Sequence, residues 1–167
     1  MDTKFLIDSY QQLKGLRRNW ESHWQECADY TLPRRADVTK RRSRGDKRFE
    51  LVFDSTAIHA AELLASSLHG MLTNAASPWF HLRFKDEDIN NNDEAKEWLE
   101  SSSQAMYQAF ARSNFQQEVH ELYLDLVVFG TGSMLIEEDD TETIKFSTRH
   151  ISEIYIQENS KGRVDTI

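Results

Sequence analysis

Apolar residues recur at helical spacing along most of this chain, and this period restricts the fold more than any other feature. The first such segment runs from about Thr3 to Tyr30. Steps of three, four or seven residues place a set of apolar side chains near one helix face: Leu6, Leu13, Leu16, Trp20, Trp24 and Cys27. Leu32-Pro33 ends this predicted helix, because proline disfavours helical geometry in the residue before it.

Three further helices follow from the same pattern. The second begins at Asp54-Ser55-Thr56, where any of the three side chains can accept free amide protons, and continues to about Leu72. Its many small residues allow close packing, so we expect a buried helix. The third covers residues 94–112. The fourth covers residues 115–129, with Ser113-Asn114 as its cap and the glycines of residues 130–132 at its end.

The remaining segments are typical of strands and turns. Residues 79–84 alternate apolar and polar side chains, which predicts a strand, and residues 85–93 form a polar loop. Near the C-terminus, strands are expected at residues 133–138, 143–148 and 152–158, with a fourth beginning at residue 163. The predicted fold class is therefore α+β, mainly helical with a small antiparallel sheet near the C-terminus.

Two regions follow from this order of elements. Residues 1–131 form a helical region that contains a basic loop at residues 34–48, and residues 132–167 form antiparallel hairpins. The chain stops at the start of a strand, so we expect it to continue as part of a longer protein of which it is about the first third. The apolar positions expected to be buried anchors are Trp20, Trp24, Leu64, Leu68, Trp79, Phe80, Trp98, Phe115 and Leu126.

Several classes of protein are excluded by composition. The length of 167 residues fits one domain or two small ones, and no apolar run reaches the roughly 18 residues of a membrane span. The first residues lack a basic segment followed by a long apolar stretch, so we expect no secretory signal. One cysteine, Cys27, excludes an internal disulfide framework and suits a reducing compartment.

Motifs for catalysis or ligand binding are weak. Gly130-x-Gly132 follows a helix and precedes a strand, which is the reverse of a dinucleotide-binding motif. His23 and Cys27 lie four residues apart, but two ligands do not make a tetrahedral metal site. The acidic run at residues 137–142 lacks calcium-loop spacing. We therefore expect no catalytic residue, no metal and no cofactor, and the protein is not expected to be an enzyme.

Charge is distributed unevenly. The formal net charge is -8, yet residues 34–48 hold eight of the 20 basic residues and two of the 28 acidic ones, so this window is +6 and the rest of the chain -14. The candidate contact residues are Arg34, Arg35, Lys40, Arg41, Arg42, Arg44, Lys47 and Arg48. Phosphates of nucleic acid and an acidic protein surface are equally good partners for them, and the alternative is a flexible, solvated loop.

The order of several short motifs resembles the N-terminal part of the head-to-tail connecting, or portal, proteins of short-tailed bacteriophages. The resemblance runs from about Arg17 to Ile167. The segments that carry it are Arg18-Asn19-Trp20-Glu21-x-x-Trp24, Tyr30-Thr31-Leu32-Pro33-Arg34, Phe53-Asp54-Ser55-Thr56-Ala57, residues 60–73, Pro78-Trp79-Phe80-x-Leu82, Ser113-Asn114-Phe115 and Phe129-Gly130-Thr131-Gly132. Each is weak alone, and their order and gaps make the resemblance specific.

The resemblance implies a structural role. Portal proteins form a ring, commonly of twelve subunits, at one vertex of the capsid, and double-stranded DNA passes through it during packaging and ejection. The implied partners are other copies of the chain, the terminase large subunit, tail adaptor proteins, and the major capsid and scaffolding proteins. The implied location is the virion, after assembly in the host cytoplasm and without a membrane. The N-terminal third belongs mainly to the outer wing of the ring.

In such a ring the basic loop would meet acidic segments of a neighbouring subunit. The candidates are Asp86, Glu87, Asp88, Glu137, Glu138, Asp139, Asp140 and Glu142. Reversing the charges of Arg41, Arg42 and Arg44 would then impair ring assembly. The strongly acidic remainder would hold sliding DNA only weakly. The alternative function is a small nucleic-acid-binding regulatory protein that uses the basic loop directly, and steep salt dependence of DNA binding would distinguish it.

Overall fold

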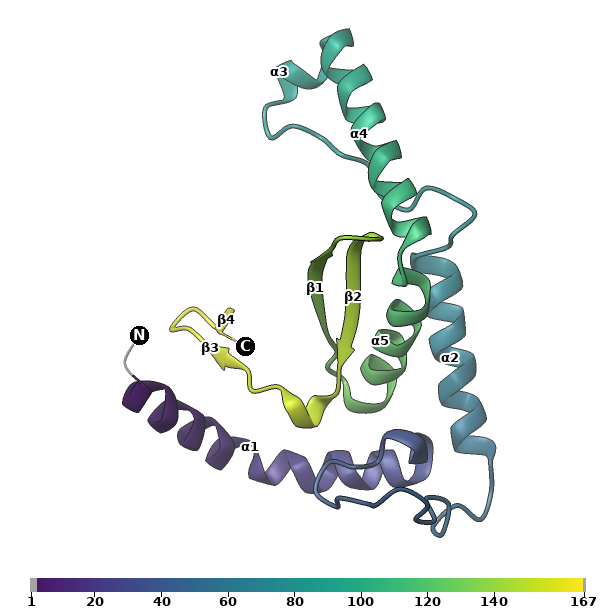
Figure 1. Ribbon diagram of the computed structural model, residues 1–167, viewed down its shortest axis with the longest axis vertical. Coiled ribbons are helices and arrows are strands. Elements are labelled where there is room, and N and C mark those ends of the chain that lie inside the picture. The colour runs from purple at the N-terminus through teal and green to yellow at the C-terminus, as the bar shows by residue number, and fades with distance from the viewer. Residues whose placement is uncertain (1–2, 167) are drawn as a thin grey trace. The chain divides into compact units, whose positions relative to one another are not determined.

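The structure is a computed structural model that describes residues 3–166 (Figure 1). Its helices are α1 (Thr3–Thr31), α2 (Thr56–Leu72), α3 (Glu87–Asn90), α4 (Asp93–Arg112) and α5 (Phe115–Phe129), with 3-10 turns η1 (Pro33–Arg35) and η2 (Ile151–Glu153). Its strands are β1 (Ser133–Asp139), β2 (Thr143–Arg149), β3 (Gln157–Glu158) and β4 (Val164–Thr166). β1 pairs with β2, and β3 pairs antiparallel with β4. The α+β prediction, with a small antiparallel sheet near the C-terminus, is confirmed.

Local capping explains where the helices begin and end. Thr56 at the start of α2 donates its N–H to Asp54, and Asn92 caps α4 through the N–H of Glu94. Phe115 at the start of α5 donates to the hydroxyl of Ser113, as the sequence predicted. Gly130 follows α5 with φ +71°, in the left-handed region that glycine enters without strain. The four long predicted helices are therefore confirmed to within a few residues.

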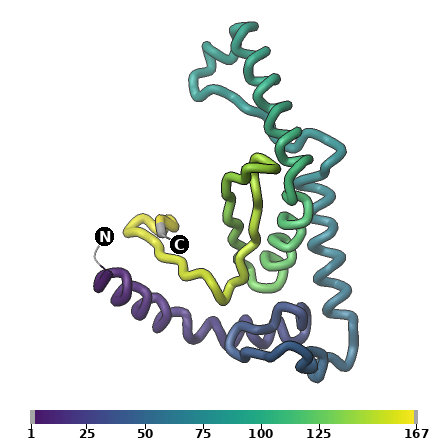
Figure 2. The backbone as a smooth tube through the Cα atoms, in the orientation of Figure 1, coloured from purple at the N-terminus to yellow at the C-terminus, as the bar shows by residue number. Residues whose placement is uncertain are grey.

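The chain divides into two compact units, which we treat separately. Unit 1 consists of the residues up to Leu63, Leu124–Ser133 and the residues from Arg149 onward. Unit 2 consists of Leu64–Tyr123 and Met134–Thr148. Figure 2 follows the path of the chain, in which α2 and α5 each contribute residues to both units.

The core of unit 1 lies around the C-terminal half of α1. Its buried members are Ala28, Ala36, Phe129, Ile151 and Ile154. Arg17 fixes the turn η2 to α1, because its guanidinium donates to the carbonyls of Ile151 at 3.0 Å and Ser152 at 3.2 Å, and also to that of Ile154. The same guanidinium lies over the ring of Tyr155, 4.1 Å from the centroid.

Aromatic rings form the core of unit 2. Trp79 stacks on Phe115 with 5.8 Å between centroids, and Phe110 stacks on Phe115 at 4.9 Å. Phe146 from β2 meets Phe115 edge-on at 5.1 Å. These contacts join the segment after α2, helices α4 and α5, and the β1–β2 hairpin into one cluster.

Three predicted elements were wrong. Residues 79–84 are extended but belong to no strand, because side chains of α4 rather than another strand bind their main chain. The expected polar loop at residues 85–93 contains the short helix α3, capped by Asp86. The strand expected at residues 152–158 is reduced to β3, because Arg17 gathers three carbonyls of η2 into a turn.

Most of the predicted buried anchors were also wrong. Of the nine, Phe115 is fully buried, and Trp24, Leu68 and Phe80 are half-buried. The exposed anchors are Trp20, Leu64, Trp79, Trp98 and Leu126. Helix α2 was expected to be buried, but only Ala61 and Ala65 are buried along it, and Met71 is 81% exposed. A helical period shows which face is apolar, but not whether another element covers that face.

Candidate contact site in the basic segment

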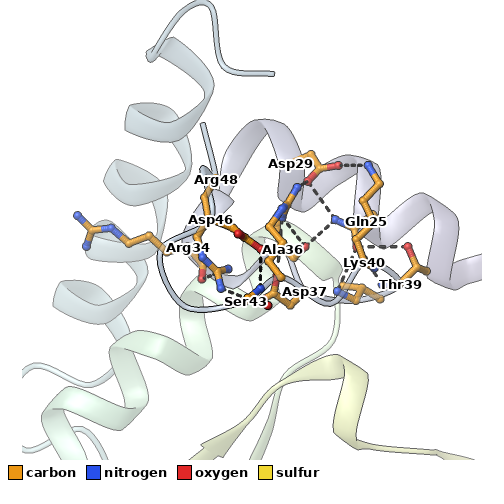
Figure 3. A network of polar contacts seen from close by, with 12 residues as sticks. Gln25, Asp29, Arg34, Ala36, Asp37, Thr39, Lys40, Ser43, Asp46 and Arg48 are labelled. Atoms are coloured by element: carbon orange, nitrogen blue, oxygen red, sulfur yellow. Dashed lines mark hydrogen bonds and ion pairs between the residues drawn. The ribbon is translucent and has the colours of Figure 1, made fainter. Parts of the chain in front are cut away.

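The basic segment, residues 34–48, is a folded structure built around the side-chain amide of Gln25 (Figure 3). Gln25 lies on α1 and is 4% exposed. Its Oε1 accepts from the main-chain N–H groups of Val38, Thr39 and Lys40 at 3.1, 2.9 and 3.2 Å. Its Nε2 donates to the carbonyl of Ala36 at 2.6 Å. One buried amide therefore satisfies four main-chain groups that no helix or sheet satisfies.

Asp29 lies one helical turn beyond Gln25 and is also buried. It accepts hydrogen bonds from Gln25 at 3.0 Å, from Arg42 at 3.0 Å and from Lys40 at 3.2 Å. Burial raises the pKa of this carboxyl, but the hydrogen bonds from Arg42, Lys40 and Gln25 outweigh it, so its pKa lies below the ordinary value. Asp29 is therefore a carboxylate that holds two cations of the segment.

Arg48 closes the segment on itself. Its guanidinium donates to Asp37 at 2.7 Å and to the carbonyl of Arg34 at 3.1 Å. Between these ends, the N–H of Ser43 donates to Asp46 at 2.7 Å. The two acidic residues of the segment therefore hold its own loop in shape.

A buried ion pair joins the segment to α5. The guanidinium of Arg35 lies 3.1 Å from the carboxylate of Asp125, whose side chain is 1% exposed. Asp125 stands between the buried Leu124 and the exposed Leu126, so α5 contributes a charge from its otherwise apolar C-terminal half. This is the most deeply buried charged side chain among those described as buried.

These contacts divide the eight candidate cations into two groups. Arg35, Lys40, Arg42 and Arg48 are each bound to a carboxylate of the same unit. The outward group consists of Arg34, Arg41, Arg44 and Lys47. Their side chains are exposed, and none makes a hydrogen bond or ion pair with another part of residues 3–166. The outward group is therefore the part of the segment that can meet a partner.

The acidic candidates belong to unit 2, whereas the basic segment belongs to unit 1. Asp86 caps α3 by accepting from the N–H of Asp88 at 3.1 Å, and Glu87 is exposed beside it. At the β1–β2 turn, Asp139 accepts from the hydroxyl of Thr141 and from the N–H groups of Thr141 and Glu142. These bonds lower the pKa of Asp139 to about 2. The other acidic candidates, Glu137, Glu138, Asp140 and Glu142, are exposed.

His150 provides a pH-dependent contact in unit 1. Burial, and then the charge of Arg35, lower the pKa of His150 below its ordinary value. The folded state thus favours the neutral ring, so its contribution is complete above pH of about 6.5 and is lost as the pH falls through the folded-state pKa. We expect the free energy of unfolding in urea to decrease as the pH is lowered below about 6.5. The decrease should be smaller in His150→Asn, because the asparagine side chain does not titrate and can still accept the N–H of Ser152 as His150 does. An equal fall in both proteins would contradict this assignment.

Metal-binding clusters and membrane-spanning helices were sought among the described residues. Cys27 Sγ lies 3.8 Å from His23 Nε2, and no cluster of three or more metal-binding side chains occurs among residues 3–166. In the same residues, no helix has the length and apolar character needed to cross a membrane.

Sequence reasoning missed the residues that organise the segment. Gln25, Asp29 and Asp125 lie within predicted helices, and none of them is among the predicted contact residues. A signal existed for Asp125, since it is the one acidic residue within the apolar run from Leu122 to Phe129. Gln25 and Asp29 are four apart, which places them on one helix face, but nothing local indicates that a loop covers them.

Comparisons with known proteins agree with the resemblance in the sequence. The profile of the family described as "Bacteriophage head to tail connecting protein" matches residues 3–167. The chain is 32% identical over 167 residues to the "Probable portal protein" of Bordetella phage BPP-1, covering 99% of this chain and 30% of that protein. It is 34% identical over 162 residues to the "Portal protein" of Salmonella phage epsilon15, covering 96% of this chain and 29% of that protein.

The family match and the two similarities each extend over nearly the whole of this chain. The chain belongs to the bacteriophage head-to-tail connecting protein family, and both of these relatives are named as portal proteins. It spans a little under a third of the length of those relatives.

Proposed function

We propose that this chain is the N-terminal wing part of a portal subunit, in a ring at a capsid vertex through which double-stranded DNA is packaged and ejected. The observation that carries the proposal is similarity to two phage portal proteins along 96% or more of the chain. The role is structural rather than catalytic. The proposed partners are further copies of the chain, capsid and scaffolding proteins, the terminase large subunit, tail adaptors and the DNA.

The basic segment supports a role in assembly. The main chain that carries its outward cations is held by Gln25 and Asp29, so the points at which these side chains leave the main chain are set by the fold. A ring repeats one heterologous contact between neighbouring copies, and a fixed patch of charge can set the register of that contact. We propose that the outward group meets acidic residues of the neighbouring copy, with Glu87 and Asp88 of α3 as candidates.

The structure shows which basic residues can be substituted to test this contact without disturbing the fold of the segment. Arg42 holds Asp29 and the carbonyl of Ala36, so reversing its charge would unfold the segment itself. The outward residues can be changed without loss of an internal contact of their side chains. We therefore replace Arg34, Arg41, Arg44 and Lys47 together by Glu.

We expect this fourfold variant of the full-length protein to lose ring assembly by at least tenfold, measured by size-exclusion chromatography with light scattering and by negative-stain microscopy. The control replaces four exposed basic residues elsewhere by Glu, namely Lys14, Arg18, Arg112 and Lys161. It should retain assembly. Rings of normal yield from the fourfold variant would contradict the role of the basic segment, and an unsubstituted protein that never forms rings would contradict the proposed function.

The alternative is a regulatory protein that binds nucleic acid through the same cations. Binding through four phosphate contacts would weaken steeply with salt, because each contact releases counterions. Tight, salt-dependent DNA binding by a monomeric full-length protein would favour this alternative over the portal.

A further inference from the structure

Residues 79–84 form an extended segment that lacks a strand partner. The segment alternates exposed and half-buried side chains, with His81 and Arg83 outward and Phe80, Leu82 and Phe84 toward α4. Phe80 stacks on Tyr107 with centroids 4.4 Å apart, and Phe84 stacks on Trp98 at 5.6 Å. This period of two is that of a strand packed on one face.

Side chains take the place of a neighbouring strand along one edge of this segment. The N–H and the carbonyl of Phe80 both bond to the hydroxyl of Tyr107, each at 2.7 Å. The N–H and the carbonyl of Phe84 both bond to the amide of Asn90, at 2.9 and 3.0 Å. Residues 80 and 84 therefore present their main-chain groups to one side, and that side is satisfied.

The opposite edge is open. In an extended chain the main-chain groups of residues 81 and 83 point away from those of residues 80, 82 and 84. Within residues 3–166, no hydrogen bond is made by the N–H or the carbonyl of His81 or Arg83. An exposed strand edge of this kind is a template for pairing with another strand.

The β1–β2 hairpin has the same construction. On β2, the N–H and carbonyl of Phe146 bond to the amide of Asn114 at 2.9 and 2.7 Å, and the N–H of Thr148 donates to Glu118 at 2.6 Å. The outer edge of β2 is thus satisfied by side chains. For the part of the chain described, the main chain of β1 makes no hydrogen bond outside its pairing with β2, so its outer edge is open as well.

The two open edges carry opposite charge. His81, Arg83 and the adjacent Lys85 are exposed on or beside the first edge, and Glu137 and Glu138 are exposed on β1. Placing Arg83 opposite Glu137 forms a cross-strand ion pair in either strand direction. The same register sets Ile136, which is 62% exposed, beside Leu82 or Phe84 on the apolar face.

We infer that residues 79–84 pair with β1 of a second copy of this chain, forming an intermolecular sheet that continues into β2. This inference rests on the proposed function, because every subunit of a ring has a neighbouring copy beside it. Charge complementarity and the shared construction of the two edges favour this occupant over an unrelated strand. Each chain offers both edges, so the contact can repeat from copy to copy.

Disulfide cross-linking tests the pairing. In full-length protein with Cys27→Ser, the double variant Arg83→Cys and Glu137→Cys should give, on mild oxidation, a ladder of linked multimers on a non-reducing gel. The control pairs Arg83→Cys with Lys161→Cys, a similarly exposed residue in the β3–β4 turn. It should give no ladder. Absence of a ladder from the first pair, or equal ladders from both, would overturn the inference.

Charge exchange provides a second readout. Arg83→Glu should reduce ring yield severalfold, and adding Glu137→Arg in the same chain should restore it. Additive losses would overturn the pairing. If the unsubstituted protein forms rings while both tests fail, the strand pairing is wrong and the proposed function stands. A ladder from a protein that forms no rings would support the pairing and contradict the ring.

Discussion

Replacing Asp125 by alanine should lower the free energy of unfolding of unit 1 by about 3–5 kcal/mol, because it leaves the Arg35 guanidinium without its buried carboxylate. The side chain of Asp125 is 1% exposed and that of Arg35 is 21% exposed, so water replaces the lost partner of Arg35 only in part. The measurement is urea unfolding followed by tryptophan fluorescence, with hydrogen exchange of residues 28–38 as the local readout.

Two control variants test whether the loss of stability comes from the unpaired charge of Arg35. The double variant Arg35→Met and Asp125→Leu replaces both charges by apolar groups, and should lose far less stability than Asp125→Ala alone. Lys96→Ala removes one partner of an exposed pair with Asp93 and should cost about 0–1 kcal/mol. A loss from Asp125→Ala no larger than that of Lys96→Ala would show that the buried pair contributes little.

Replacing Gln25 by alanine should release the basic segment from α1. The change removes the acceptor of three main-chain N–H groups and the donor to the carbonyl of Ala36, so we expect a loss of about 2–3 kcal/mol. The amides of Val38, Thr39 and Lys40 should exchange with deuterium much faster in the variant. Measurement is by hydrogen exchange with mass spectrometry, alongside urea unfolding.

The matched control is Gln12→Ala, on the exposed surface of the same helix. It should change neither exchange in the basic segment nor stability by more than a few tenths of a kcal/mol. Since the outward cations stand on this scaffold, Gln25→Ala should also reduce ring assembly without changing any charge. Unchanged exchange of residues 38–40 would refute the assigned role of Gln25.

The sequence predicted the helices well, because their signals are local. The predicted boundaries of residues 115–129 coincide with α5, and the first helix was placed one residue short of its observed end at Thr31. Caps such as Ser113 and Asp54 act within two residues of the groups that they bind. Periodicity and capping need no knowledge of distant contacts, so they can be read from the chain itself.

Burial was predicted poorly for the converse reason. Trp20 and Trp98 carry the pattern of core residues, yet they are 59% and 58% exposed. The alternation at residues 79–84 identified an extended segment with one apolar face, but whether it became part of a sheet depended on a partner. The side chain of Tyr107, 27 residues later, satisfies its inner edge instead.

Local patterns in the chain are enough to predict the helices, their ends, the family resemblance and a basic segment in an acidic chain. Which of the basic side chains can meet a partner depends on the tertiary contacts. Arg42 and Arg44 are two residues apart and chemically identical, but Asp29 of α1 holds the first while the second is exposed. That distinction depends on contacts between residues 13 positions apart and more, which no local pattern encodes.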